Sequence, residues 1–381
     1  MAPLTATLAA SAAIGLGLTL ARVGRERRAE RRRARNRSLG VYAGEPLSGG
    51  LKRMATEQLD LAIEQLSTGN GAGPAEEAIH ETRKALKRLR TMVRVLEPGL
   101  GERALAQETA VLKDAAGQLS AARDAEVMLA TLESLVERHP RKLDRGGVRR
   151  LRRRLIEERE QARAETLGDP VRMALVVADL SACRLRVQTW QEPRRDEREL
   201  LESGLRRVYG QGRRRYRRAR AAKGERTTAM HEWRKRVKDL RYLGEMLQRQ
   251  PSPAPAFAVP LPGGAAARRE RPDRDSQPLR KLARKADGLG EILGEEHDLA
   301  VLAARIRGSH GKGAVEPKLG RGTRRALSRA ISGRRRKLQR KALKQGRNLY
   351  ADPTKKFVAR TGRLYARAHR KAARRLARSL S

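Results

Sequence analysis

Two stretches of the chain, IHETRKALKRLRTMVRVLE at residues 79–97 and MHEWRKRVKDLRYLGEMLQ at residues 230–248, align with each other without gaps. They share His80 and His231, Glu81 and Glu232, Arg83 and Arg234, Lys84 and Lys235, Lys87 and Lys238, Leu89 and Leu240, and Arg90 and Arg241. A second pair, LSAARDAEVML at 119–129 and LGEEHDLAVLA at 293–303, follows in the same order and shares Leu119 and Leu293, Asp124 and Asp298, and Val127 and Val301. Two matches in the same order predict a duplicated helical unit.

Apolar residues on the first stretch recur at steps of three and four, which places them on one face of a helix. Similar spacing runs through most of the chain from Leu51 onward, and strand signals are nearly absent. We therefore predict an all-α fold, with a first helical half over residues 45–190 and a second over residues 196–381. A Pro-rich loop over residues 250–278 interrupts the second half.

Basic side chains occupy the neighbouring face of each repeated helix. On the first helix this face spans roughly 21 Å, and like charges at successive turns repel one another unless an anion binds. A row of cations this regular matches a ligand with regularly spaced negative charge, such as a chain of phosphates bound by Arg and Lys. The candidate binding residues are His80, Arg83, Lys84, Lys87, Arg90, Arg94, His231, Arg234, Lys235, Lys238 and Arg241.

A charged helix face is often only solvated, and the repetition is what favours a binding site here. The two histidines head the two rows, at His80 and His231. There they would donate to an oxyanion, and we expect them to gain charge as the pH falls towards about 6.

The composition limits the class of partner. The chain has 87 Lys and Arg against 43 Asp and Glu, a formal net charge of +44, which favours a polyanion: nucleic acid, an anionic membrane surface or a phosphate polymer. Aromatic residues make up 3% of the chain, which argues against a protein that stacks the bases of single-stranded nucleic acid on rings. The single cysteine, Cys183, excludes an intramolecular disulfide and a Cys-based zinc or iron–sulfur site, as is typical of an intracellular protein.

No sequence pattern indicates catalysis or metal binding. The six histidines are scattered, and neither an H-E-x-x-H, a G-x-S-x-G nor a phosphate-binding glycine loop is present. Asp124 and Asp298 occupy matching positions, and we interpret them as structural acids that pair with nearby cations. The alternative, that they are metal ligands or general bases, lacks a supporting cluster of acids. We expect no metal, no cofactor and no enzymatic activity.

The N-terminal tail, residues 1–38, has a composition of its own. An uncharged stretch over residues 2–21 is followed by a run of arginines, whereas a secretory signal carries its positive charge first. Two readings remain open: a weak membrane anchor that leaves the rest of the chain in the cytoplasm, or a disordered or weakly helical tail. Membrane contact is the less favoured reading, because Thr, Ser and Gly dilute a stretch of barely spanning length.

The paired H-x-x-R-[KR]-x-x-[KR]-x-x-R helices and the paired L-x-x-x-[RH]-D-x-x-V helices resemble the CHAD domain, the conserved histidine α-helical domain. The resemblance covers about residues 45–381, including the opening stretch GEPLSGGLKRMATEQLDLAIEQL at 44–66. It implies two four-helix bundles related by a pseudo-two-fold axis, with the His-bearing helices facing a basic cavity between them. It also implies binding of inorganic polyphosphate, and cytoplasmic members of the family can collect on polyphosphate granules. The family's basic positions fall here on His80, Arg83, Lys84, Lys87, Arg90, His231, Arg234, Lys235, Lys238 and Arg241.

Two departures from the repeat bear on the strength of binding. His297 stands where the first repeat has Arg123, and Asp239 replaces the cation at Arg88, so we expect the second half to bind less strongly. The E-x-E-x-K signature of the CYTH triphosphatase domain, which accompanies CHAD in many relatives, is absent.

These patterns lead to one principal hypothesis and two others. We predict a stand-alone, non-catalytic polyphosphate-binding protein of the cytoplasm, associated with polyphosphate granules. The alternative is a basic protein that binds or compacts nucleic acid, since a groove of this charge also binds DNA or RNA through phosphates, more weakly if polyphosphate is the true ligand. A phosphohydrolase or kinase acting on polyphosphate would need converging acidic metal ligands, which the sequence does not show.

Overall fold

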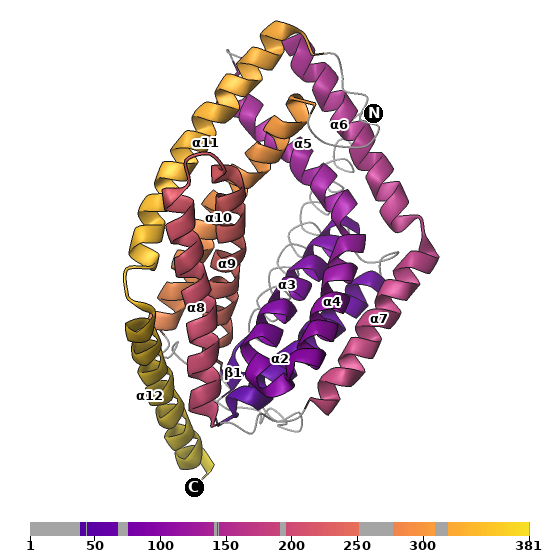
Figure 1. Cartoon of the computed structure of the whole chain (residues 1–381). Coiled ribbons are helices and arrows are strands. Elements are labelled where there is room, and N and C mark those ends of the chain that lie inside the picture. The colour runs from indigo at the N-terminus through magenta and orange to yellow at the C-terminus, as the bar shows by residue number, and fades with distance from the viewer. Residues whose placement is uncertain are drawn as a thin grey trace, which may run out of the picture.

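The chain folds as helices around a few short connections. The structure is a computed structural model that describes residues 39–42, 44–67, 75–140, 143, 145–190, 196–250, 277–308 and 319–380. In this part of the chain it has eleven helices, α2 to α12, and one pair of two-residue strands (Figure 1). The predicted all-α class is therefore confirmed. The N-terminal tail and residues 251–276 of the Pro-rich loop lie outside the described residues.

Four helices of the first half form a bundle. They are α2 (Leu47–Ser67), α3 (Ala75–Leu100), α4 (Glu102–Gln118) and α7 (Pro170–Thr189). Helices α2 and α4 each pack against both α3 and α7, so that the apolar stripe of α3 lies inside the bundle. Leu51, Leu86, Leu89 and Leu112 are fully buried there. Because this stripe is buried, the cationic face of α3 lies on the outer surface of the bundle.

Two further helices lead away from this bundle and back to it. Helix α5 (Ser120–Arg138) follows α4 after a single turn at Leu119, and α6 (Arg145–Leu167) packs against α5 (Figure 1). Helix α7 then begins at Pro170, the position where a missing backbone N–H is best tolerated. Asp169 caps this helix by accepting a hydrogen bond from the backbone N–H of Arg172 at 2.9 Å.

The second half repeats this order of packing. Helix α9 (Arg226–Met246) packs between α8 (Glu197–Ala221) and α10 (Gln277–Ile306), while α11 (Arg321–Leu349) packs on α10 and α12 (Thr354–Leu380) on α8. In Figure 1, α11 and α12 follow one another along the outside of this half, as α6 and α7 do in the other. Helix α10 is continuous where the first half breaks between α4 and α5. The pseudo-two-fold relation between the halves stays a prediction.

An aromatic cluster packs against the face of α9 that is turned towards α8. Trp233 on α9 is fully buried, with its ring 5.2 Å from that of Tyr216 on α8. Tyr209 stacks on Phe357 with ring centroids 3.7 Å apart, and Tyr350 packs against both tyrosines. Because Trp233 anchors one face of α9 to α8, the residues on its other face point towards the first half.

The two halves contact each other at several places. Helix α3 packs against α8 and α9, and α5 packs against α10. The strands β1 (Val41–Tyr42) and β2 (Arg249–Gln250) pair in parallel, so that the beginning of the first half is joined to the end of α9. These contacts fix the distance between the two repeated helices.

Across the described residues, none of the helices combines the length and apolar character that a membrane crossing requires. The uncharged stretch at residues 2–21 lies outside them, so its role stays a prediction.

Candidate anion-binding cavity

A cavity of about 690 Å³ lies between the two halves, bounded by α3, α5, α9 and α10. Both repeated helices turn their basic faces into it. The basic residues and histidines that line the cavity are His80, Arg83, Lys87, Arg90 and Arg94 of α3, Arg123 of α5, His231, Arg234, Lys235, Arg236 and Lys238 of α9, and His297 of α10. Nine of the eleven residues singled out in the sequence are thus brought to one concave surface.

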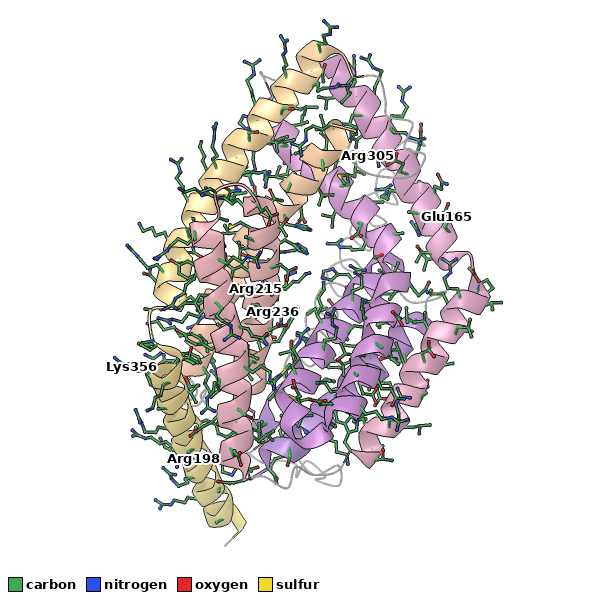
Figure 2. All side chains as sticks on the ribbon, viewed as in Figure 1. Glu165, Arg198, Arg215, Arg236, Arg305 and Lys356 are labelled. Carbon is green, nitrogen blue, oxygen red and sulfur yellow. The ribbon has the colours of Figure 1, made fainter. Side chains whose placement is uncertain are left out.

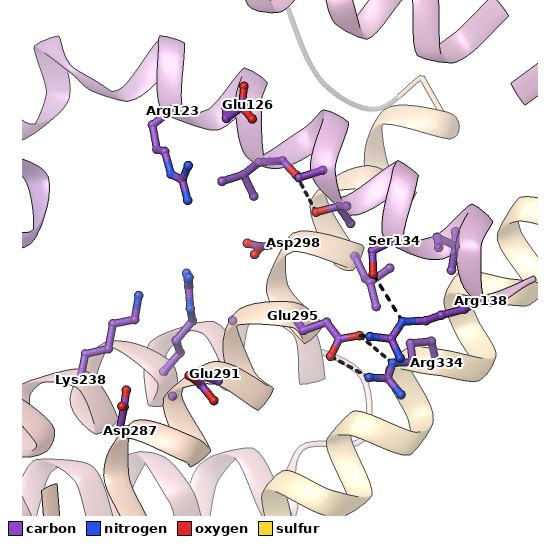
Figure 3. A pocket seen from close by; sticks show the side chains of 18 of the residues that line it. Arg123, Glu126, Ser134, Arg138, Lys238, Asp287, Glu291, Glu295, Asp298 and Arg334 are labelled. Atoms are coloured by element: carbon purple, nitrogen blue, oxygen red, sulfur yellow. Dashed lines mark hydrogen bonds and ion pairs between the residues drawn. The ribbon is translucent and has the colours of Figure 1, made fainter. Parts of the chain in front are cut away.

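The other two candidates lie elsewhere. Lys84 does not line the cavity, and its ammonium lies 3.2 Å from the Glu81 carboxylate on the same helix. Arg241 is held by Glu245 at 2.7 Å and by Asp287 of α10. It lines a neighbouring cavity of about 480 Å³, shown in Figure 3, which shares Arg123, Arg234, Lys238 and Asp298 with the central cavity.

Tertiary contacts fix the direction of several of these cations. A guanidinium N–H of Arg83 donates to the backbone carbonyl of Ala116 near the end of α4, at 2.9 Å. Arg94 of α3 and Arg236 of α9 pair with one carboxylate, that of Asp239, at 2.9 and 3.1 Å. These three cations are therefore positioned before any ligand binds.

Asp239 and Arg88 do not play the parts that the sequence comparison suggested. Arg88 is buried, donates to Gln58 at 3.1 Å and lies 3.8 Å from Glu245, so the first half has no additional cavity cation at this position. Asp239 instead links the halves through Arg94. The difference between the halves at this position is thus an added acid in the cavity and not a lost cation, and weaker binding by the second half stays a prediction.

Burial makes two of the lysines unusual. The pKa of Lys238 is lowered to about 7, first by burial and then by the positive charge of Arg234. The pKa of Lys87 is lowered to about 8, again by burial first and by Arg83 next. Near neutral pH, each of these amines has a neutral fraction, and an anion in the cavity would favour protonation.

The histidines of the cavity serve mainly as hydrogen-bond donors and acceptors and add little positive charge. The Nδ1 atoms of His231 and His297 lie 3.1 Å apart, a separation at which one ring must accept a hydrogen bond and therefore be neutral. Burial and then the charge of His231 lower the pKa of His297 to about 3. Burial also lowers the pKa of His80 and of His231, so the gain of charge that we expected near pH 6 shifts to lower pH.

The two repeated aspartates differ in their contacts. The Asp124 carboxylate lies 4.0 Å from the Arg83 guanidinium. Asp298 lines the cavity and feels the charge of Arg234 and Lys238, but makes no direct ion pair with any described residue. Figure 3 shows Asp298 facing the space between Arg123 and Lys238. The described part of the chain contains no group of three His, Cys, Asp or Glu side chains suited to a metal ion.

Two arginines and a histidine in the cavity were not among the candidates. Arg123 and His297 precede the repeated aspartates, so the second pair of matching stretches carried a signal for both. Arg236 has no counterpart, because the matching residue of the first helix is Ala85. The C-terminal cations Arg363, Arg367 and Arg370 line a separate groove of about 810 Å³ between α8 and α12.

Comparisons with known proteins agree with this architecture. A crystal structure of the CHAD domain from the plant Ricinus communis is similar, with a TM-score of 0.54 and 18% identity over 83% of this chain and 95% of that chain. PptA from Streptomyces chartreusis is similar with a TM-score of 0.52 and 16% identity, over 79% of this chain and 99% of that chain. A search of curated proteins gave no match. The family model of the CHAD domain matches residues 54–258, more than half of the sequence, and the chain therefore belongs to the CHAD domain family.

Proposed function

We propose that the chain binds inorganic polyphosphate in the central cavity and does not cleave it. The observation that carries the proposal is the convergence of two rows of Arg and Lys, one from α3 and one from α9, on the same concave surface. Membership of the CHAD domain family supports a polyphosphate-related function. Guanidinium and ammonium groups at successive helical turns suit a thin polymer whose every unit carries negative charge.

The lining of the cavity favours polyphosphate over nucleic acid. Apart from imidazoles, Tyr242 is the one aromatic ring among the described residues that line it, and the Tyr242 side chain is buried. Unstacked bases would find little surface on which to stack. A duplex carries its phosphates on the outside of a thick cylinder, whereas a polyphosphate chain is thin enough to enter between two helices.

The arrangement of acids supports binding without cleavage. Phosphoryl transfer normally uses metal ions held by acidic groups that converge on the phosphate. Of the four acids that line the cavity, Asp239 is already paired with Arg94 and Arg236, and Glu232 with Lys235. The described residues contain no group of three His, Cys, Asp or Glu side chains that could hold such a metal ion. We further propose that the protein is cytoplasmic and collects on polyphosphate granules, which fluorescence microscopy of the tagged chain would test.

The central test removes four cavity cations together. The variant Arg83→Ala, Lys87→Ala, Arg234→Ala, Lys238→Ala should lose retention on long-chain polyphosphate while its helical circular dichroism is unchanged. A matched variant with Arg149, Arg153, Arg324 and Arg325 replaced by Ala loses the same formal charge from exposed sites on α6 and α11. Retention of binding by this control and its loss in the cavity variant would support the site.

Three results would contradict the proposal. Equal loss of binding in both variants would show attraction by net charge alone. Displacement of polyphosphate by duplex DNA at equal phosphate concentration, in about 0.15 M salt, would favour the nucleic-acid alternative. Release of orthophosphate from polyphosphate in the presence of Mg²⁺ or Mn²⁺ would show that the chain is an enzyme.

A further inference from the structure

A second group of arginines lies outside the central cavity, where α8 packs on α9. Arg214, Arg215 and Arg218, near the C-terminal end of α8, line a pocket of about 440 Å³. Glu232 and Arg236 of α9 form the other wall of this pocket. Figure 2 shows Arg215 of α8 and Arg236 of α9 near one another in the second half of the molecule.

Within the part of the chain that the structure describes, no ion pair neutralises the charge of these three arginines. Elsewhere on α8, Arg198 pairs with Glu202 at 2.9 Å and Arg207 pairs with Glu97 of α3. In contrast, none of the three makes an ion pair of 4.0 Å or less with a described acid. Arg218 lies three residues after Arg215 and four after Arg214, so it shares a helix face with each of them and like charges repel there. The dipole at the end of α8 offsets only a part of this repulsion.

The acid in the pocket leaves most of this positive charge in place. The Glu232 carboxylate is held by the ammonium of Lys235 at 2.7 Å, and this hydrogen bond is the main cause of its lowered pKa. Three arginines without an ion pair, together with Arg236, which is paired with Asp239, therefore face one carboxylate that already has a cationic partner. A pocket of this composition suits an anion with several negative charges.

The pocket and the central cavity share a wall. Arg236 and Glu232 line both spaces. One guanidinium N–H of Arg236 donates to Gln211 of α8 at 3.0 Å, and the same nitrogen lies 3.1 Å from Asp239 in the cavity. Burial lowers the pKa of Arg236, and the positive charges of Arg94 and, to a smaller extent, Arg215 add to this shift. A phosphate that passes Arg236 would therefore next meet Arg215.

We propose that the pocket lined by Arg214, Arg215 and Arg218 is a second phosphate-binding subsite, which takes the part of a polyphosphate chain that extends beyond the central cavity past Arg236. The proposal rests on the proposed function of the central cavity. A short chain held entirely in that cavity does not reach the pocket, while a long chain contacts both. The protein should therefore distinguish polyphosphates by length.

The experiment compares tripolyphosphate with long-chain polyphosphate on the full chain. The variant Arg215→Ala, Arg218→Ala should bind the long chain about tenfold more weakly, the loss expected for one or two charge-assisted contacts. Its affinity for tripolyphosphate should be unchanged. The dependence of log K on log salt for the long chain should become shallower by about 1, since fewer phosphates are neutralised.

The control variant is Arg217→Ala, Arg220→Ala, on the same helix. Both residues are exposed, and neither lines the pocket or the central cavity. Circular dichroism of both variants would show that α8 is intact, and Arg215→Lys, Arg218→Lys should retain most of the affinity for the long chain.

The outcomes separate this inference from the proposed function. Equal effects of the two arginine pairs, an equal loss of affinity for tripolyphosphate, or an effect seen on duplex DNA alone would overturn the second subsite. If the unaltered chain binds long polyphosphate, and only the four-residue cavity variant loses binding, the second subsite is wrong and the proposed function stands. If the unaltered chain binds no polyphosphate, both are wrong.

Discussion

Binding of polyphosphate should weaken steeply as the pH rises from 7 to 9, because two lysines in the cavity need a proton to carry charge. The pKa is about 7 for Lys238 and about 8 for Lys87 in the empty protein. A bound polyanion would raise both values back towards that of an exposed lysine, so binding is coupled to proton uptake. At pH 8, about 0.9 proton would be taken up by Lys238 and about 0.5 by Lys87.

Summed over the range from pH 7 to 9, this uptake corresponds to a fall in affinity of about 500-fold if both amines are fully protonated in the complex. Fluorescence titration with long-chain polyphosphate, whose internal phosphates stay ionised, would measure the affinity at each pH. Calorimetry in two buffers of different ionisation enthalpy would measure the number of protons directly. The variant Lys87→Met, Lys238→Met should bind less tightly at pH 7 and lose most of the pH dependence. An affinity that is constant from pH 7 to 9 would refute the reasoning.

Lys87 and Lys238 should make the empty protein more stable as the pH rises, although they make ligand binding weaker. Their pKa values are lower in the folded protein than in the unfolded chain, so between about pH 7 and 10 the unfolded chain binds more protons. The contribution of Lys87 and Lys238 to the free energy of unfolding of the empty protein therefore rises with pH over this window. Thermal unfolding of the unaltered chain and of the double Met variant would isolate this contribution, which should be absent in the variant.

The remaining predictions concern stability. Asp239→Ala leaves two partly buried arginines, Arg94 and Arg236, without their shared acid and should lower the free energy of unfolding by about 3 kcal/mol. Added polyphosphate should restore a part of this loss. An unchanged denaturant midpoint would contradict the prediction. Gly346→Ala places a methyl group 2.5 Å from the Trp233 ring and should destabilise by about 1–3 kcal/mol. Gly333→Ala, on the same helix with open space around it, should stabilise by up to about 1 kcal/mol, and thermal unfolding that ranks the two Gly variants equally would contradict the packing described here.

Much of the fold and of the cavity could be predicted from the repeated helix. A residue's angular position on a helix is set by its number alone, so the stripe through Leu86 and Leu89 had to be buried together. For the same reason Arg83, Lys87, Arg90 and Arg94 share a face. Two copies of such a face favour a common ligand, and the structure places both on one cavity.

The other features of the cavity depend on contacts between helices, which cannot be predicted from the periodicity of a single helix. Arg241 occupies the same angular position as Arg90, yet Asp287 of α10 holds it at the neighbouring cavity. The burial that lowers the pKa of Lys238 comes from helices packed around it. Arg236 was missed because it has no counterpart in the repeat, and its importance follows only from its position between α8 and Asp239.

The contacts between the halves have a mechanical consequence. Helix α3 is fixed against α9, and α5 against α10, so the helices that bound the cavity are held on each side. The two rows of like charge cannot relax by moving apart when no ligand is present. The unliganded molecule therefore retains the mutual repulsion of its cations, and neutralising that repulsion adds to the affinity of an anion without the need for a hinge to close.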